Sequence, residues 1–416
     1  MRKIICYPSS SVPDHFDNDV DYFELFSSPD GSYDNVRPLG LSLPRELKKY
    51  GIVPSVAALD FAAFAFSVVA VDKLIPRGDS PDGWTRMIDL TVFISEPEKW
   101  MSIKSKIEKM LKFLTGDFWK LTFQLANGPF IDATYEPHQR DNDCVCLLSG
   151  GMDSLVGAID LLSEKRNPLF VSQIIIGDAK RQVDFANRFG GGNHCQWSIG
   201  TLRGPEGSTR ARSIAFFAFA LLSAAATSET GESTEIIVPE NGFISLNIPL
   251  DANRIGSLST KTTHPIYMAL LQEIWDALGI KAKLFKTKGE VLKECKDRQL
   301  MEELIFETNS CGKFRRHGLR HCGVCVPCLV RRAAFLEDGL HDTTQKGYRY
   351  DDISKSNFMD LTAVALAVKQ VELSGINKLV KGNLSFASPE DRKFYLGVVS
   401  RGINELKNFL EGYDIL

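Results

Sequence analysis

Residues 144–154 read CVCLLSGGMDS and join three local patterns in one short stretch. The first part is apolar and short, which predicts a buried strand. Two adjacent glycines follow, and they permit a tight turn in which backbone N–H groups can approach a ligand closely. A helix is expected directly after the turn, so the turn lies at a helix N-terminus. With two serine hydroxyls beside them, these N–H groups predict an anion-binding loop.

Short apolar segments alternate with longer helical ones on the C-terminal side of this loop. Strands are expected at 169–176, 195–199 and 235–238, and helices at 153–162, 181–189, 210–226 and 265–278. This alternation is typical of β-α-β units, and it predicts an α/β domain with a parallel sheet and helices on both faces. In such sheets, ligands bind beyond the carboxyl ends of the strands.

The loop lacks the usual nucleotide-binding signatures, because it has no GxxxxGK[ST] and no GxGxxG follows its strand. SGGMDS instead resembles the SGGxDS signature of the N-type ATP pyrophosphatases, called PP-loop enzymes. The resemblance implies that the loop holds the β,γ-pyrophosphate of ATP, which is cleaved between its α and β phosphates. It implies that Asp153 orders the loop or helps to place Mg²⁺. The ATP-binding residues implied are Ser149, Gly150, Gly151, Met152, Asp153 and Ser154.

Four of the nine cysteines lie close together near residue 320. They are Cys311, Cys322, Cys325 and Cys328. Two successive CxxC steps with a fourth cysteine upstream suit tetrahedral Zn²⁺ in a closed structural site, with no open position for catalysis. An iron–sulfur cluster is the alternative, since CxxCxxC also occurs there. The other five cysteines have no metal-binding spacing, and an odd total in a long chain fits a reducing compartment.

A PP-loop followed by a late four-cysteine site resembles QueC, the 7-cyano-7-deazaguanine synthase family. Those enzymes convert 7-carboxy-7-deazaguanine into a nitrile with ATP and ammonia, and they carry a structural zinc. The segments around Lys288 and Arg331 match QueC motifs, which implies contacts from these two residues to phosphate or to the substrate carboxylate. Arg212 lies near the position of a QueC arginine–asparagine pair. Asn241 lies in the loop that would face the substrate, where this chain departs from the QueC pattern.

The resemblance covers residues 141–335, which leaves two flanking regions. Residues 1–140 are expected to form an α+β recognition or scaffold extension, and residues 336–416 a helical region. Long proteins of this form resemble the QatC type encoded by the bacterial Qat antiphage defence system. That resemblance implies a deazaguanine-type or other small carboxylate as substrate, ammonia or an amine as nucleophile, and protein partners from the same operon, one of which could be the acceptor.

Composition excludes several other classes of protein. With 416 residues and 44% hydrophobic residues, the chain is neither disordered, collagen-like nor a disulfide miniprotein. Its net charge of −3 gives no sign of nucleic-acid or membrane-surface binding. The longest apolar run, 214–222, is short of the ~20 residues that cross a bilayer, so a cytoplasmic protein is expected. Two alternative functions stay open: a tRNA-modifying PP-loop enzyme, and a nucleotide-binding subunit with reduced catalysis.

Overall fold

The computed structural model contains two five-stranded sheets, and every strand pairing in them is parallel. The structure describes residues 2–29, 31, 35–132, 134–200, 202–207, 209–227, 233–250, 261–286, 292–356, 358–380 and 382–416. None of the described helices combines the length and the apolar composition needed to cross a membrane.

The sheet that holds the glycine loop has the order β10-β9-β6-β7-β8. Its strands are β6 (Cys144–Leu147), β7 (Pro168–Gln173), β8 (His194–Trp197), β9 (Thr234–Val238) and β10 (Ala282–Lys286). Its helices are α5 (Met152–Ser163), α6 (Ala179–Arg188), α7 (Arg212–Ala224) and α9 (Pro265–Ala277). Val145 and Leu147 join the core that contains α7, whereas Cys144 and Cys146 join the core that contains α5. The predicted parallel sheet with both faces covered is therefore confirmed.

The N-terminal region is a second parallel sheet, so the prediction of an α+β extension was wrong. Its order is β3-β2-β1-β4-β5. The strands are β1 (Arg2–Pro8), β2 (Val20–Leu25), β3 (Val36–Leu39), β4 (Met87–Ile94) and β5 (Phe118–Leu125). Between β3 and β4 lie α1 (Leu43–Tyr50) and α2 (Val56–Leu74), and between β4 and β5 lie α3 (Pro97–Ser102) and α4 (Lys104–Thr115). These helical connections return the chain to the same end of the sheet, so β4 and β5 run parallel to their neighbours, and β1, β2 and β3 also pair in parallel.

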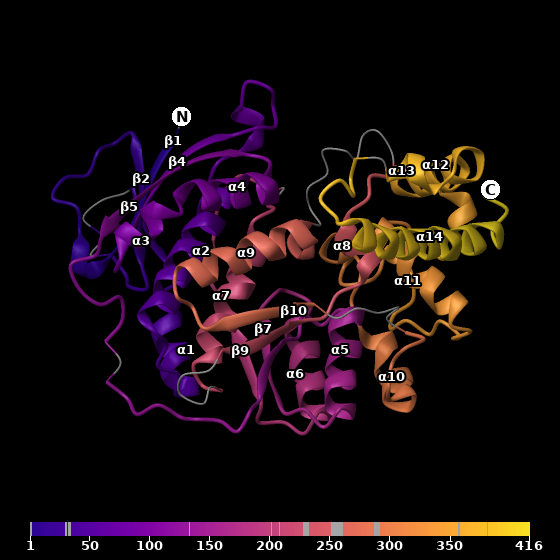
Figure 1. Cartoon of the computed structure of the whole chain (residues 1–416), viewed down its shortest axis with the longest axis horizontal. Helices are drawn as coiled ribbons and strands as arrows, with labels where there is room; N and C mark the ends of the chain where they lie inside the picture. The colour runs from indigo at the N-terminus through magenta and orange to yellow at the C-terminus, as the bar shows by residue number, and fades with distance from the viewer. Residues whose placement is uncertain are drawn as a thin grey trace.

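Helix α2 joins the two sheets into one core. It is apolar around almost its whole circumference, because one side packs on β3 and β4 and another side on α7. Phe66 of α2 meets Phe219 of α7 with ring centroids 5.3 Å apart. Phe61 of α2 meets Trp275 of α9 edge to face at 5.7 Å. A single hydrophobic cluster therefore runs from the N-terminal sheet into the sheet of β6. Figure 1 shows α2 between the N-terminal sheet and helices α7 and α9.

The C-terminal region is helical, as predicted, and has its own core. Its helices, in residues 336–416, are α12 (Met359–Ser374), α13 (Ile376–Leu379) and α14 (Pro389–Glu411). Helix α11 (Val326–Glu337) precedes them and shares their core, whereas α10 (Arg298–Leu304) belongs to the core that contains α5. Helix α14 packs on α11 and on α8 (Gly242–Leu246), which follows β9, and it lies far from the N-terminal sheet (Figure 1). Short 3₁₀ helices lie at Ser9–Ser11, Arg77–Asp79, Lys261–Thr263, Ile305–Glu307, Phe314–His317 and Ile353–Lys355.

Candidate functional site

The glycine loop lies between the central strand β6 and the first turn of α5, as the sequence predicted. Gly150 has φ +88°, a left-handed conformation that glycine adopts without strain. Ser149 Oγ accepts a hydrogen bond from the Gly151 N–H (3.2 Å) and donates to Ser154 Oγ (3.0 Å). Ser154 Oγ in turn donates to the Gly151 carbonyl (3.0 Å). These bonds fix the loop before any ligand binds, with the N–H groups of the α5 N-terminus beside it.

Two other segments hold the loop from behind. The Asn309 N–H donates to the Gly150 carbonyl (3.0 Å), and the Asn309 side chain donates to Asp178 (2.9 Å) at the start of α6. Gln182 Nε2, from α6, donates to the Ser149 carbonyl (3.0 Å). Because both carbonyls accept hydrogen bonds from protein donors, contacts within the protein keep the shape of the loop.

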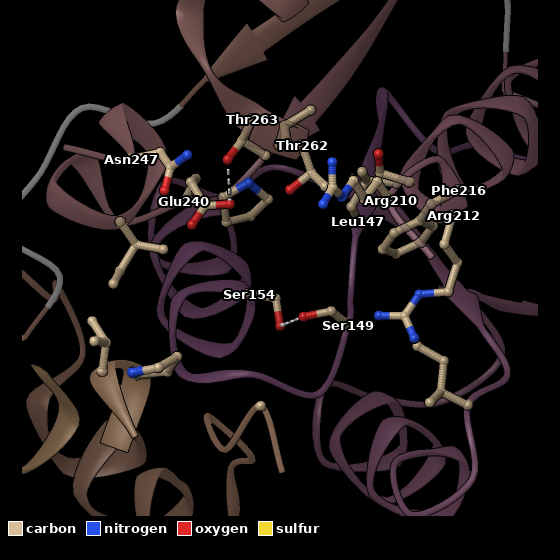
Figure 2. Close-up of a pocket in the computed structure, with 18 of the residues that line it drawn as sticks. Leu147, Ser149, Ser154, Arg210, Arg212, Phe216, Glu240, Asn247, Thr262 and Thr263 are labelled. Carbon is tan, nitrogen blue, oxygen red and sulfur yellow. Dashed lines mark hydrogen bonds between the residues drawn. The ribbon is translucent and has the colours of Figure 1, made fainter. Parts of the chain in front are cut away.

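A cavity of about 600 Å³ opens beyond the carboxyl ends of β6, β7 and β9 (Figure 2). Ser149 and Ser154 form one wall, and Glu240 and Asn247, which follow β9, form the opposite wall. Thr263 donates a hydrogen bond to Glu240 (2.7 Å) on that opposite wall. The volume falls within the usual range for a small-molecule or cofactor site. A ligand here would contact the loop and the segment after β9 together.

Three cationic residues line the cavity: Arg210 and Arg212, near the start of α7, and Lys313, from the cysteine segment. Arg212, the first residue of α7, points into the cavity on the side of Ser149 (Figure 2). The Arg212 side chain is open to solvent through the cavity, but protein atoms surround it on the other sides. The loss of solvation lowers the pKa of Arg212, and the nearby Asp178 carboxylate partly offsets this decrease. Lys313, from the cysteine segment, lines the same cavity and pairs with Asp360 of α12 (3.3 Å). Positive charge therefore faces the loop where an anion would bind.

Arg331 does not line this cavity, although the sequence suggested that it contacts a ligand. It is completely buried in α11. Its guanidinium donates to Thr308 Oγ1 (2.5 Å), to the Ile305 carbonyl (3.1 Å) and to Thr344 Oγ1 (3.1 Å). All of these partners belong to the protein, so Arg331 holds the segment that leads to Cys311.

Asn241 is also absent from the described wall of the cavity. The Asn241 side chain accepts hydrogen bonds from the Phe243 N–H (2.9 Å) and the Ile244 N–H (3.2 Å), so it caps the N-terminus of α8. Lys288 lies outside the described residues. Of the four predicted catalytic or substrate-binding residues, Arg212 is the one that the described structure brings to the cavity.

The four predicted metal-binding cysteines come together in one buried group. Their sulfur atoms all lie within 4.8 Å of one another, with Cys322 and Cys328 at 3.9 Å and Cys311 and Cys325 at 4.0 Å. Four thiolates around one Zn²⁺ lie about 3.8 Å apart, as follows from Zn–S bonds of about 2.3 Å in a tetrahedron. The group could therefore hold one metal ion. A multi-iron cluster fits less well, because its irons and sulfides would separate the thiolates.

A buried ionic network in the N-terminal half was missed from the sequence. Arg86 pairs with Asp72 (2.5 Å) and Asp117 (2.6 Å), and Arg77 pairs with Asp117 (2.7 Å). Burial alone would raise the pKa of Asp117, and the two arginines more than offset it, so its pKa is lowered. Asp72 also bonds to the backbone at Arg210, which itself lines the cavity. A charged residue inside the apolar run of α2 was the signal that could have revealed this network.

No protein-family model and no solved structure matches this chain.

Proposed function

We propose that the protein is an ATP-dependent, AMP-forming enzyme of the QueC-like type. It would adenylate a small carboxylate, 7-carboxy-7-deazaguanine or a related compound, and transfer the acyl group to ammonia or an amine. The observation that carries this proposal is the SGGMDS loop, which opens from the central strand into a cavity lined by Arg212.

The loop suits the triphosphate half of the reaction. Its N–H groups and serine hydroxyls would hold the pyrophosphate, and Asp153 would help to hold Mg²⁺, which neutralises phosphate charge. Arg212 would stabilise charge that grows on the phosphates as the bond between α and β phosphorus breaks, because a fixed cation in a partly enclosed cavity needs no reorganisation. The loop is held by protein contacts alone, which supports binding without a large conformational change.

The opposite wall suits the carboxylate half. Glu240, Asn247 and Thr263 offer hydrogen-bond acceptors and donors to a planar heterocycle. A carboxylate oxygen of the substrate would attack the α phosphorus, and pyrophosphate would leave with the bonding electron pair. The amine nitrogen would then attack the acyl carbon, and AMP would leave. Adenylation is needed because a carboxylate oxygen is a poor leaving group and AMP is a good one.

The cysteine group supports a structural Zn²⁺ in this scheme. Four thiolates complete a tetrahedral coordination sphere, so the metal would fix the segment 311–328 without taking part in chemistry. That segment supplies Lys313 and Cys325 to the wall of the cavity. The proposal extends to a role in antiphage defence with a partner protein as acceptor, on the strength of the resemblance to the long QueC-like proteins.

The test is product analysis with purified protein, ATP, Mg²⁺ and 7-carboxy-7-deazaguanine, in the presence of ammonium. AMP and pyrophosphate are expected in equal amounts, and only when the carboxylate is present. Release of ADP and phosphate, or no carboxylate-dependent release of AMP, would contradict the assignment. Omitting ammonium should leave the adenylate on the enzyme and slow turnover.

A further inference from the structure

A second cavity, of about 540 Å³, lies between α8, α11 and α14. Phe243 of α8 lines both this cavity and the first one, and thus forms part of the wall between them. Gly402 of α14 packs directly on Phe243, since a Cβ at Gly402 would lie 2.5 Å from the Phe243 ring. The two cavities are therefore separate spaces on opposite sides of a closely packed contact.

The second cavity combines an apolar floor with a rim rich in carboxylates. The floor includes Met152, Phe243, Met268, Val330, Phe394 and Leu406. The lining carboxylates are Glu294, Glu337, Asp338, Glu390, Asp391 and Glu405. The lining cations are two, Lys293 and Arg401, so carboxylates outnumber them six to two. This excess of negative charge favours a cationic ligand over a neutral or anionic one.

Several of the rim carboxylates already have partners. Glu337 pairs with Lys293 (2.7 Å), and Asp338 pairs with Arg298 (2.5 Å). Glu405 is different, because among the described residues it forms neither a hydrogen bond nor an ion pair, although it is half-buried. Burial raises the pKa of Glu405 and nearby Glu337 raises it further, although Lys293 and Arg401 oppose this rise in part. A cation beside Glu405 would compensate for this burial and repulsion.

We propose that the second cavity binds an organic cation, a protonated primary amine carried on an apolar or aromatic body. The ammonium group would lie against Glu405, and the apolar body would cover the floor. The aromatic rings of Phe394 and Tyr395 line the same space and favour such a ligand through cation–π contact. This site is distinct from the proposed ATP site, because Glu405 and the other charged residues that line it do not line the first cavity, although Phe243 lines both cavities and Met152 belongs to the glycine loop.

The probe is 2-phenylethylamine, with its neutral isostere 2-phenylethanol as the comparison, titrated calorimetrically into the full chain. The amine should bind about tenfold or more tightly than the alcohol, as expected for a hydrogen bond to a charged group. Glu405→Gln should remove most of that difference and leave the alcohol unchanged. Glu411→Gln, on the same helix but outside the cavity, should change neither titration.

Two further measurements decide where the probe binds. Val398→Phe should fill the cavity and abolish binding of both probes. Saturating ATP should not displace the amine, because the first cavity is a separate space. The proposal is overturned if the amine binds no tighter than the alcohol, if Glu405→Gln has no effect, if Val398→Phe still binds the amine, or if ATP competes with it.

Discussion

A hydrogen bond joins Asp72, on helix α2 of the N-terminal half, to the backbone of Arg210, just before helix α7 of the β6 sheet. Asp72 Oδ2, on α2, accepts a hydrogen bond from the Arg210 N–H at 2.6 Å, and a second from the Ala211 N–H at 2.8 Å. These two donors directly precede α7, where helical N–H groups have no partner within the helix. A carboxylate at this position also interacts favourably with the helix dipole. The N-terminal half thereby fixes the start of the helix that carries Arg212.

Removing the Asp72 carboxylate should destabilise the whole chain. Asp72→Ala leaves two buried backbone donors and part of the charge of Arg86 and Arg77 without partners. Breaking a buried ion pair in this way costs about 3–5 kcal/mol. Urea unfolding followed by circular dichroism measures the loss. The matched control is Asp79→Ala, an exposed site nearby that should change stability by less than about 0.5 kcal/mol. Equal stability of the two variants would show that the network is not a structural element.

Arg212 should be needed for turnover rather than for folding. Arg212→Ala is expected to lower kcat/KM for AMP formation by about 100-fold or more, which is typical of removing one charge-stabilising group from a preorganised site. Its unfolding midpoint should stay close to that of the parent chain. Arg203→Ala, an exposed arginine upstream, should keep full activity. Wild-type kinetics in Arg212→Ala would remove this residue from the site.

The Ser149 hydroxyl should be needed for a functional loop. Ser149→Ala removes the acceptor of the Gly151 N–H and the partner of Ser154. We expect AMP formation to fall by about 100-fold, through loss of a ligand donor and of loop order. Ser163→Ala, at the exposed end of α5, the helix that follows the loop, is the control and should keep full activity. If both variants turn over equally, the loop does not hold the reacting phosphates.

Metal analysis should find one Zn²⁺ per chain. Cys325→Ser should lose the metal and much of the folded protein, because metal binding and folding of such a segment are coupled. Cys295→Ser, outside the cysteine group, should keep one Zn²⁺. The readouts are elemental analysis and the thermal unfolding midpoint with and without a chelator. Iron in place of zinc, or a full metal content in Cys325→Ser, would contradict the assignment.

His194 should make the folded protein less stable as the pH falls below neutral. Ser172 donates its hydroxyl to the Leu148 carbonyl (2.6 Å), so Ser172 Oγ accepts from His194 Nε2–H (2.8 Å). Burial lowers the pKa of His194 from 6.5 to about 4, and Lys49 adds to the fall. The folded state thus favours the neutral imidazole. The contribution of neutral His194 to the free energy of unfolding is complete above pH 6.5 and is lost as the pH falls toward 4.

The comparison is between the parent chain and His194→Gln, by urea unfolding at a series of pH values. The parent should lose stability faster between pH 6.5 and 4. The difference in slope should be at most about 1.4 kcal/mol per pH unit, reduced by the partial solvent access of the ring. Parallel curves for the two proteins would mean that His194 does not titrate in this range.

The sheet of β6 was predictable because its signals are local. Residues 144–154 contain the strand, the turn and the helix start together, and the alternation that follows has the periods of a parallel sheet. The four cysteines were predictable for the same reason, since their spacing alone brings them close. Ser149 and Arg212 line the same cavity because both lie at the same end of that sheet.

The N-terminal sheet and part of the site depend on contacts that spacing does not encode. Among the described residues, no α-helix joins β1 to β2 or β2 to β3, so the pattern of parallel β-α-β units is missing there. Arg331 has a motif that matches a ligand contact, yet its direction is set by tertiary packing against Thr308 and Thr344. The bond from Asp72 to Arg210 joins residues far apart in sequence, and no local pattern predicts it.

The transfer of oxygen-18 from the carboxylate to AMP tests the central claim most directly. The full chain is incubated with ATP, Mg²⁺, ammonium and 7-carboxy-7-deazaguanine labelled in its carboxyl group, and AMP is analysed by mass spectrometry. Adenylation followed by attack at the acyl carbon leaves one labelled oxygen on each AMP. We predict labelled AMP, and its loss in Ser149→Ala. Unlabelled AMP, or ADP as the product, would contradict adenylation of a carboxylate on the loop at residues 149–154.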